Sequence, residues 1–182
     1  MNKKIALLRG INVGGKRKVL MKDLQELFAE LGFYDIVTYI QSGNVIFNSS
    51  SQLSEIEIAA KIENGITNKY NFSVPVIIVS AKRLERTIKN NPFILDDDTD
   101  VSRLALTFLK GKPKTENRIE AESYVFKPDK FNIIDRDVYI YFEGKSHLSK
   151  MTNNFFENKL KVSATTRNWK TVMKLSELSR VC

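Results

Sequence analysis

Cysteine and histidine are nearly absent from the 182-residue sequence, and each scarcity excludes a class of protein. The single cysteine, Cys182, excludes an intramolecular disulfide framework and a thiolate metal cluster. The single histidine, His147, excludes a histidine-rich metal site and any mechanism that needs two histidines. Four prolines and eight glycines are too few for a collagen-like or linker-dominated chain. What remains is an ordinary globular composition, with 42% apolar and 27% charged residues.

Long apolar runs are also missing. A run of four apolar residues precedes Arg9, whereas a signal peptide needs about 7–15 apolar residues and a membrane helix about 20. We therefore expect a cytoplasmic protein that does not associate with a membrane.

Positive charge is what the sequence has in excess, and it is unevenly placed. The net charge of +8 divides into +5 for residues 1–90, −3 for residues 91–143 and +6 for residues 144–182. A basic surface favours polyanions such as nucleic acid, nucleotides or an acidic partner. The plainer interpretation is that the charge serves solubility alone.

The apolar pattern of residues 1–90 predicts the order strand, helix, strand, strand, helix, strand. The expected elements are a strand at 4–8, a helix from 19 to 31, strands at 36–40 and 45–47, a helix at 54–69 and a strand at 74–79. The last strand is nearly all apolar, so we expect it to be central in the sheet, although Pro75 favours an end or edge for its first part. This order is the β-α-β-β-α-β arrangement of ferredoxin-like folds.

Residues 91–182 predict a second, related α+β half that follows a short helix at 81–90. Strands are expected at 103–109, 124–127, 131–134 and 138–142, and helices at 114–121, 153–160 and 168–178. The segment 124–127 would be an additional strand relative to the first half. The fold class is therefore α+β, with subdomains at 1–90 and 91–182 that can share one core.

The predicted topology brings two polar segments to one end of the first sheet. The first and second strands run in the same direction, so the loop after the first strand, 9–18, faces the turn at 41–44. The candidate ligand-binding residues in these segments are Arg9, Asn12, Gly14, Gly15, Lys16, Gln41, Ser42 and Asn44.

The loop at 9–18 has anion-binding chemistry. Glycines allow backbone N–H groups to point at a phosphate, and a helix N-terminus adds a favourable field. Residues 10–16 even satisfy the phosphate-loop pattern, but Arg17 stands where that motif needs a magnesium-binding serine or threonine. We therefore reject a phosphate-loop NTPase. A solvated strand-to-helix turn is the competing interpretation.

A second polar cluster, 164–171, contains the candidates Arg167, Asn168 and Trp169. A guanidinium beside an aromatic ring can contact a base or phosphate, although core packing is the role we favour for Trp169. Thr165, Thr166 or Asn168 can cap the last helix. A site shared with the loop at 9–18 requires the two segments to lie within about 20 Å, the span of two long side chains and a small ligand.

Other chemically suggestive residues favour plain roles. His147 has no aspartate at a recognisable spacing, so we expect a surface histidine. The run Asp96, Asp97, Asp98 lacks the glycine and glutamate of a calcium-binding loop and is expected to be a solvated loop. Cys182 has no partner and is not expected to be a nucleophile. No metal site is predicted, and the sequence names no cofactor.

Three motifs together resemble a known family. The stretches Ile5–Lys16 (IALLRGINVGGK), Tyr39–Val45 (YIQSGNV) and Ala164–Trp169 (ATTRNW) resemble the mainly bacterial family called domain of unknown function 1697. The resemblance implies an α+β fold of ferredoxin-like character and no particular activity. It also implies that Leu20 and Lys170, where many members carry proline and asparagine, have no essential role.

Three functions are compatible with these residues. The leading hypothesis is a cytoplasmic protein that binds a phosphate-bearing ligand, a nucleotide or RNA, at a glycine-rich basic rim. The first strand has no aromatic residue, which favours a rim pocket over an open RNA-reading sheet. The second is an enzyme of phosphoryl or acyl transfer or hydrolysis that uses the same rim, although the motifs hold no acid or base. The third is a structural or partner-binding module with an exposed patch at Phe155 and Phe156. The oligomeric state is not predicted.

Overall fold

The structure, a computed structural model, describes residues 3–50, 52–94 and 99–181. The chain forms two compact units. The first comprises Met1–Glu85 with Lys174–Cys182, and the second comprises Arg86–Met173. Each unit has its own four-stranded sheet.

The first unit contains the predicted order of strands and helices. Its elements are β1 (Lys4–Leu8), α1 (Met21–Glu30), β2 (Tyr34–Tyr39), β3 (Asn44–Asn48), α2 (Glu55–Tyr70), β4 (Val76–Ser80) and the first part of α3 (Ala81–Lys89). The strand order is β2-β3-β1-β4, and each neighbouring pair is antiparallel. This is the ferredoxin-like arrangement, so the predicted fold class of this half is confirmed.

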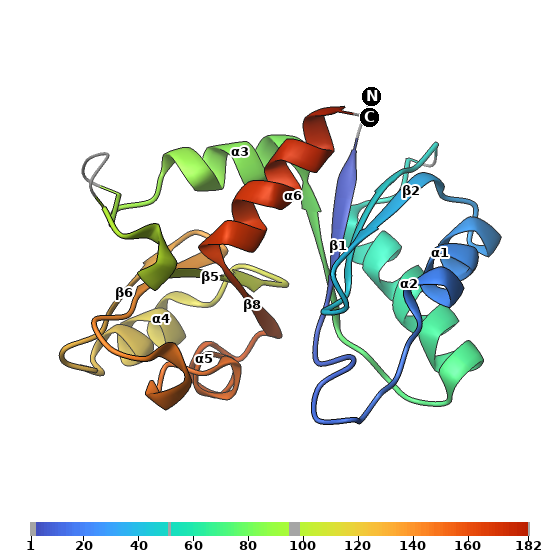
Figure 1. Ribbon diagram of the computed structural model, residues 1–182. Helices are drawn as coiled ribbons and strands as arrows, with labels where there is room; N and C mark the ends of the chain where they lie inside the picture. The colour runs from blue at the N-terminus through green and yellow to red at the C-terminus, as the bar shows by residue number, and fades with distance from the viewer. Residues whose placement is uncertain (1–2, 51, 95–98, 182) are drawn as a thin grey trace. The chain divides into compact units, whose positions relative to one another are not determined.

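One face of this sheet is covered by α1 and α2 (Figure 1). Alternate residues of β1, Ala6 and Leu8, point to this face, because successive side chains of a strand point to opposite sides. They pack with the apolar positions of the two helices, among them Leu24 and Ile62. Three rings fill the middle of this core, with Phe47 at 5.3 Å from Phe28 and 4.7 Å from Phe33 between centroids.

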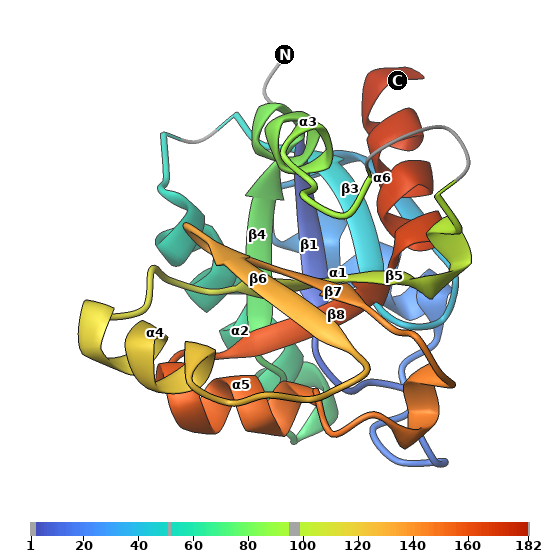
Figure 2. The ribbon, with the colours of Figure 1, turned by 90° about the vertical axis from the view of Figure 1, so that its left-hand side faces the viewer.

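The apolar strand expected at 74–79 is an edge strand, which corrects the prediction of a central position. Figure 2 shows β4 beside β1 at one side of the sheet, as the strand order states. Its run of apolar residues is nevertheless buried. The Val76 backbone N–H donates to the Glu63 carboxylate of α2 at 2.7 Å, so a helix side chain satisfies a strand donor.

The second unit repeats the same topology. Its elements are the last part of α3, η1 (Val101–Arg103), β5 (Leu104–Leu109), α4 (Thr115–Glu122), β6 (Lys130–Ile134), β7 (Asp137–Tyr141), η2 (Ser146–Leu148), α5 (Asn153–Leu160), β8 (Ala164–Asn168) and the first part of α6 (Trp169–Val181). The strand order β6-β7-β5-β8 matches that of the first sheet.

Two predicted elements of this half are wrong. Residues 124–127 form no strand, because Tyr124 and Phe126 direct their rings onto Phe155, at 5.4 and 4.8 Å between centroids, instead of pairing with a neighbour. The fourth strand is β8, within the segment expected to cap the last helix. Thr165 and Thr166 therefore lie in a strand, where their β-branched side chains are favoured.

The apolar core of the second unit also corrects the expectation of an exposed aromatic patch. Phe156 is fully buried with Ile133, Ile140 and Leu160 between the sheet and its helices. Phe155 is half-buried and packs against this cluster. Among the described residues, no helix combines the length and apolar character needed to span a membrane.

The turn between β2 and β3 approaches the end of β1 closely at Gly43. The Leu8 N–H donates to the Gly43 carbonyl at 2.8 Å. A Cβ on Gly43 would lie 2.7 Å from the Leu8 Cβ and 2.9 Å from the Ile11 Cδ1, and Gly43 has a φ of +78°. Backbone conformation and close packing both require glycine here.

We expect Gly43→Ala to destabilise the protein more than Gly32→Ala does. Gly32 has a φ of +81°, but a methyl group added there would enter open space, so this variant isolates the backbone cost of about 1–2 kcal/mol. The Gly43 variant adds overpacking of about 1–3 kcal/mol. Urea denaturation of the two variants measures the difference. Equal losses of stability would show that the contact with Leu8 relaxes freely.

Candidate functional site

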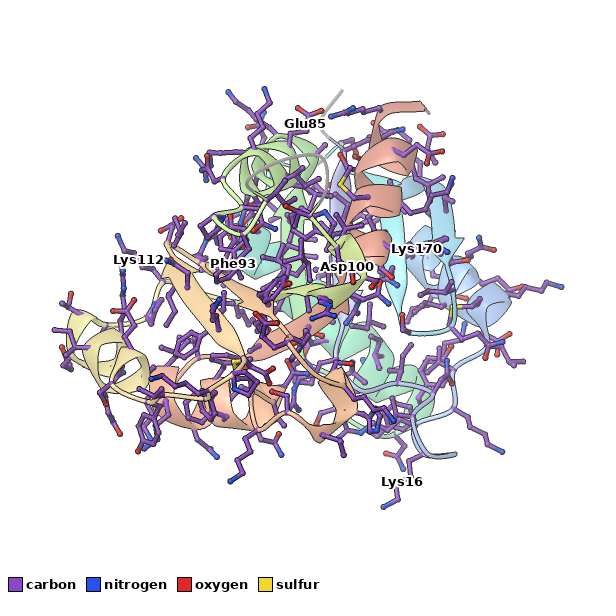
Figure 3. All side chains as sticks on the ribbon, turned by 60° about the vertical axis from the view of Figure 1, so that its left-hand side comes forward. Lys16, Glu85, Phe93, Asp100, Lys112 and Lys170 are labelled. Atoms are coloured by element: carbon purple, nitrogen blue, oxygen red, sulfur yellow. The ribbon has the colours of Figure 1, made fainter. Side chains whose placement is uncertain are left out.

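The segment between β1 and α1 folds back on itself as a small hairpin. The Asn12 N–H donates to the Arg17 carbonyl at 3.2 Å, and the Lys16 N–H donates to the Val13 carbonyl at 3.1 Å. Gly14 and Gly15 form the tip, both with positive φ, as two-residue hairpin turns require. Figure 3 shows the Lys16 side chain pointing away from the ribbon. We call residues 10–18 the glycine hairpin.

The Asn12 side chain holds the glycine hairpin in place. Its carbonyl oxygen accepts from the Val19 N–H at 2.9 Å, and its amide group donates to the Val19 and Gln41 carbonyls, both at 2.9 Å. Asn12 itself has a φ of 56°, which asparagine tolerates better than most residues. One side chain thus joins the hairpin, the start of α1 and the β2–β3 turn.

The β2–β3 turn is held by Asn44. This residue is fully buried, and its amide group donates to the Tyr39 carbonyl and the Ser42 hydroxyl, both at 3.0 Å. Together with the bond from Asn12 to Gln41, these contacts confirm the prediction that the loop after β1 lies beside this turn. Asn12 and Asn44 therefore position backbone in this structure, and the Ser42 hydroxyl accepts from the Asn44 side chain.

A pocket of about 330 Å³ lies beside the glycine hairpin. Another pocket, of about 380 Å³, lies in the second unit. The pocket beside the hairpin lies wholly in the first unit, and we call it the rim pocket. Its lining residues are Asn12, Gly15, Lys18, Val19, Leu20, Met21 and Gln41.

The electrostatics of the rim pocket favour an anion. Lys16, Arg17 and Lys18 are all exposed on the glycine hairpin. Helix α1 begins at the pocket with Leu20 as its N-cap, and no side chain caps its first N–H groups. Uncapped N–H groups at a helix start carry a partial positive charge. Asp23 in the first turn is the opposing charge.

The structure thus brings together most of the candidates from the first unit. Asn12, Gly15 and Gln41 line the rim pocket, and Gly14 and Lys16 belong to the adjoining hairpin. Arg9 is half-buried just before the hairpin, and its backbone N–H donates to the Pro75 carbonyl at 2.9 Å.

Sequence reasoning missed three residues of the pocket wall, which are Val19, Leu20 and Met21, whereas Lys18 belongs to the loop at 9–18 for which anion binding was predicted. The signal for Lys18 was its place at the end of a basic run, three residues before α1 begins at Met21. The apolar part of the wall had no such signal, because Val19 and Met21 were expected inside the helix.

The three remaining candidates belong to the second unit. Arg167 lies in β8 with 8% of its surface exposed, and its guanidinium donates to the Thr165 hydroxyl at 2.8 Å and to the Thr166 carbonyl at 2.9 Å. Burial lowers the pKa of Arg167 to about 10, so the group is charged at neutral pH. Trp169 is buried, as favoured from the sequence. That Arg167 and Lys16 share one ligand stays a prediction.

Asn168 caps the last helix. Its side-chain oxygen accepts from the Thr171 N–H at 2.8 Å, which is the bond that an N-terminal cap makes. This is one of the roles predicted for the segment.

Predictions from the sequence also concern the acid–base and metal-binding side chains. His147 is exposed in η2, as expected. Residues 3–50, 52–94 and 99–181 contain no group of three or more metal-binding side chains. The predictions for Asp96, Asp97, Asp98 and Cys182 concern residues outside those ranges.

These observations define a protein of two ferredoxin-like units with a basic glycine hairpin at the rim of the first. A family model described as "Protein of unknown function (DUF1697)" matches residues 1–139, and the chain belongs to this family. The resemblance inferred from the three motifs is thereby confirmed.

A solved structure supports the fold. A conserved bacterial protein from Streptococcus pneumoniae is similar over 98% of each chain, with a TM-score of 0.78 and 24% sequence identity. At this identity the likeness shows the fold alone. Comparison with curated proteins gives no match.

We expect Asn12→Gly to open the glycine hairpin without straining the backbone, because glycine also accepts a positive φ. The variant loses the acceptor of the Val19 N–H, and a lost hydrogen bond of this kind is worth about 1–3 kcal/mol. Hydrogen exchange at the Val19 amide should therefore accelerate about tenfold or more.

The Asn71→Gly variant is the matched control. It makes the same substitution at an exposed asparagine that also has a positive φ, of 60°, but lies outside the glycine hairpin, so protection of the Val19 amide should be retained. If both variants exchange equally fast at Val19, the bond from Val19 to Asn12 does not hold the hairpin.

Proposed function

We propose that the protein binds a phosphate-bearing ligand, a nucleotide or RNA, in the rim pocket. The observation that carries the proposal is the composition of one pocket wall. Gly15 of the glycine hairpin, Lys18 and the residues at the uncapped start of α1 line the same cavity of about 330 Å³. Backbone N–H groups, a cation and a helix start are the groups with which proteins hold phosphate.

The rest of the wall suits the non-phosphate part of such a ligand. Val19 and Met21 provide apolar surface, and Gln41 provides amide hydrogen-bonding groups beside it. Small-molecule sites commonly combine mostly apolar walls with a few polar groups that fix orientation. A nucleotide has this division into a charged phosphate and a planar, hydrogen-bonding base.

Binding fits the pocket better than acid–base catalysis does. Among the described residues that line it there is no aspartate, glutamate, histidine or cysteine. Proton transfer needs a titratable group within hydrogen-bond reach of the reacting atom. We also propose that the protein works in the bacterial cytoplasm, because nucleotides and RNA are concentrated there.

We expect the double variant Lys16→Ala, Lys18→Ala to bind phosphate-bearing ligands about threefold to tenfold more weakly. Each exposed charge contact is worth about 0.2–1 kcal/mol. Thermal-shift and calorimetric titrations at low salt with inorganic phosphate, adenosine monophosphate and a short RNA measure the effect and identify the preferred class.

The double variant Lys61→Ala, Lys82→Ala is the matched control, because both lysines are exposed in the same unit and neither lines the rim pocket. It should leave the affinity unchanged. Added salt should weaken binding to all variants, since exposed charges are screened. Equal losses in the two double variants would reduce the effect to net charge, and a flat screen with all three probes would refute the proposal.

A further inference from the structure

A second pocket lies in the second unit and takes no part in the proposed function. Its volume is about 380 Å³. Two segments build it, the connection between α4 and β6 and the connection between β7 and α5. The lining residues are Val125, Phe126, Lys127, Pro128, Asp129, Gly144, Lys145, Leu148, Ser149 and Lys150. We call it the lysine pocket.

Hydrogen bonds hold these two segments in place. The Asp129 carboxylate accepts from the Glu143 N–H at 3.0 Å, which ties the first segment to the end of β7. The Ser149 hydroxyl oxygen accepts from the Met151 N–H at 3.3 Å. The N–H of Leu148 donates to the Lys145 carbonyl at 3.0 Å. The pocket is therefore formed by ordered turns on both sides.

Three cations of the lysine pocket lack carboxylate partners. Lys127, Lys145 and Lys150 are exposed, and none of them forms an ion pair with a described residue. Several other cations among the described residues of this unit pair with carboxylates, namely Arg103, Lys112, Lys114, Arg118, Lys130 and Lys159. Among the described residues that line the pocket, Asp129 is the one acidic residue. The lining therefore has three positive charges and one negative charge.

Apolar side chains stand beside these ammonium groups without being covered. Val125 and Leu148 are each 73% exposed, although side chains of this size are usually at least partly buried. Both line the pocket, together with Phe126 and Pro128. An occupant that covered this surface would gain burial energy in addition to charge pairing.

We propose that the lysine pocket binds a small organic phosphate, with the phosphate among Lys127, Lys145 and Lys150 and an apolar or planar body against Val125 and Leu148. Three ammonium groups suit a phosphate, which carries up to two negative charges, better than they suit a carboxylate, which carries one. No arginine lines the described pocket to grip a planar carboxylate with two parallel bonds, and lysine binds phosphate as a point charge. The Ser149 hydroxyl has a proton to donate to a phosphate oxygen.

The test is a titration of the full chain followed by residue-resolved amide NMR spectra. The probes are phenyl phosphate, inorganic phosphate and benzyl alcohol, which separate the combined chemistry from charge alone and from apolar contact alone. Phenyl phosphate should shift amides of 125–129 and 144–150 and should bind most tightly of the three. Shifts confined to 12–21 would report the rim pocket instead, and would overturn this assignment without touching the proposed function.

Variants show whether the named groups carry the binding. The triple change Lys127→Ala, Lys145→Ala, Lys150→Ala should raise the Kd for phenyl phosphate about tenfold or more, because three exposed charge contacts are lost. Leu148→Ser should weaken phenyl phosphate severalfold and leave inorganic phosphate unchanged. All four residues are exposed, so the fold should tolerate these changes.

The control is Lys112→Ala, Lys114→Ala, which removes two exposed lysines of the same unit outside the pocket (Lys112 is labelled in Figure 3). It should leave the Kd for phenyl phosphate within twofold of the parent. A loss equal to that of the triple variant would overturn the proposal in favour of general attraction by net charge. Binding of an aspartate-rich peptide at 125–129 and 144–150, with none of phenyl phosphate, would overturn it in favour of a protein partner.

Discussion

The approach of Gly43 to the end of β1 is the contact on which the rim of the first unit depends. A hydrogen bond from Leu8 and the absence of a Cβ let the β2–β3 turn lie against the start of the loop. Asn12 can then reach the Gln41 carbonyl and the backbone of Val19 at once. Without that approach the β2–β3 turn, and Gln41 with it, would not complete the wall formed by the glycine hairpin and the start of α1.

The ferredoxin-like order of the first unit could be predicted because its apolar pattern changes period where its elements change. The fourth strand of the second unit could not, because its sequence, Ala-Thr-Thr-Arg-Asn, has no apolar alternation. Its polar side chains find polar partners in the neighbouring strand β5 and in helix α5. The Thr166 hydroxyl lies 2.6 Å from that of Thr107, and Thr166 also donates to the Asn153 side chain at 2.7 Å. A strand of this kind is recognisable only once its neighbours are known.

The candidate site, like the fold, could be predicted only in part from the sequence. Topology alone predicted that the loop after β1 lies beside the β2–β3 turn, because parallel strands of a sheet end at the same edge. The roles of Asn12 and Asn44 could not be predicted, since their partners are backbone groups placed by residues of positive φ such as Ile40 and Gly43. In the structure both asparagines hold backbone around the rim through their side-chain hydrogen bonds, and their contact with a ligand stays a prediction.

The net charge of a sequence segment does not show how its charged groups are paired in the folded protein. The second unit contains the acidic stretch of the chain, yet its carboxylates pair with particular lysines and arginines and leave others unmatched. The net charge of a segment therefore says little about where an anion would bind. What matters is which cations remain unpaired around a cavity, and that pattern is a property of the fold.

The way in which the chain crosses between units has a consequence for synthesis on the ribosome. The chain leaves the first unit within helix α3, after Glu85, and returns to it within helix α6, at Lys174. In the returning part of α6, Arg180 pairs with Glu85 at 2.9 Å. The first unit begins to emerge first, but it lacks its C-terminal segment, which starts at Lys174, until the second unit has been synthesised. A domain usually folds as soon as its own residues are available. Here the second unit can be complete while the first still waits for its last helix, so the order of completion is the reverse of the order of synthesis.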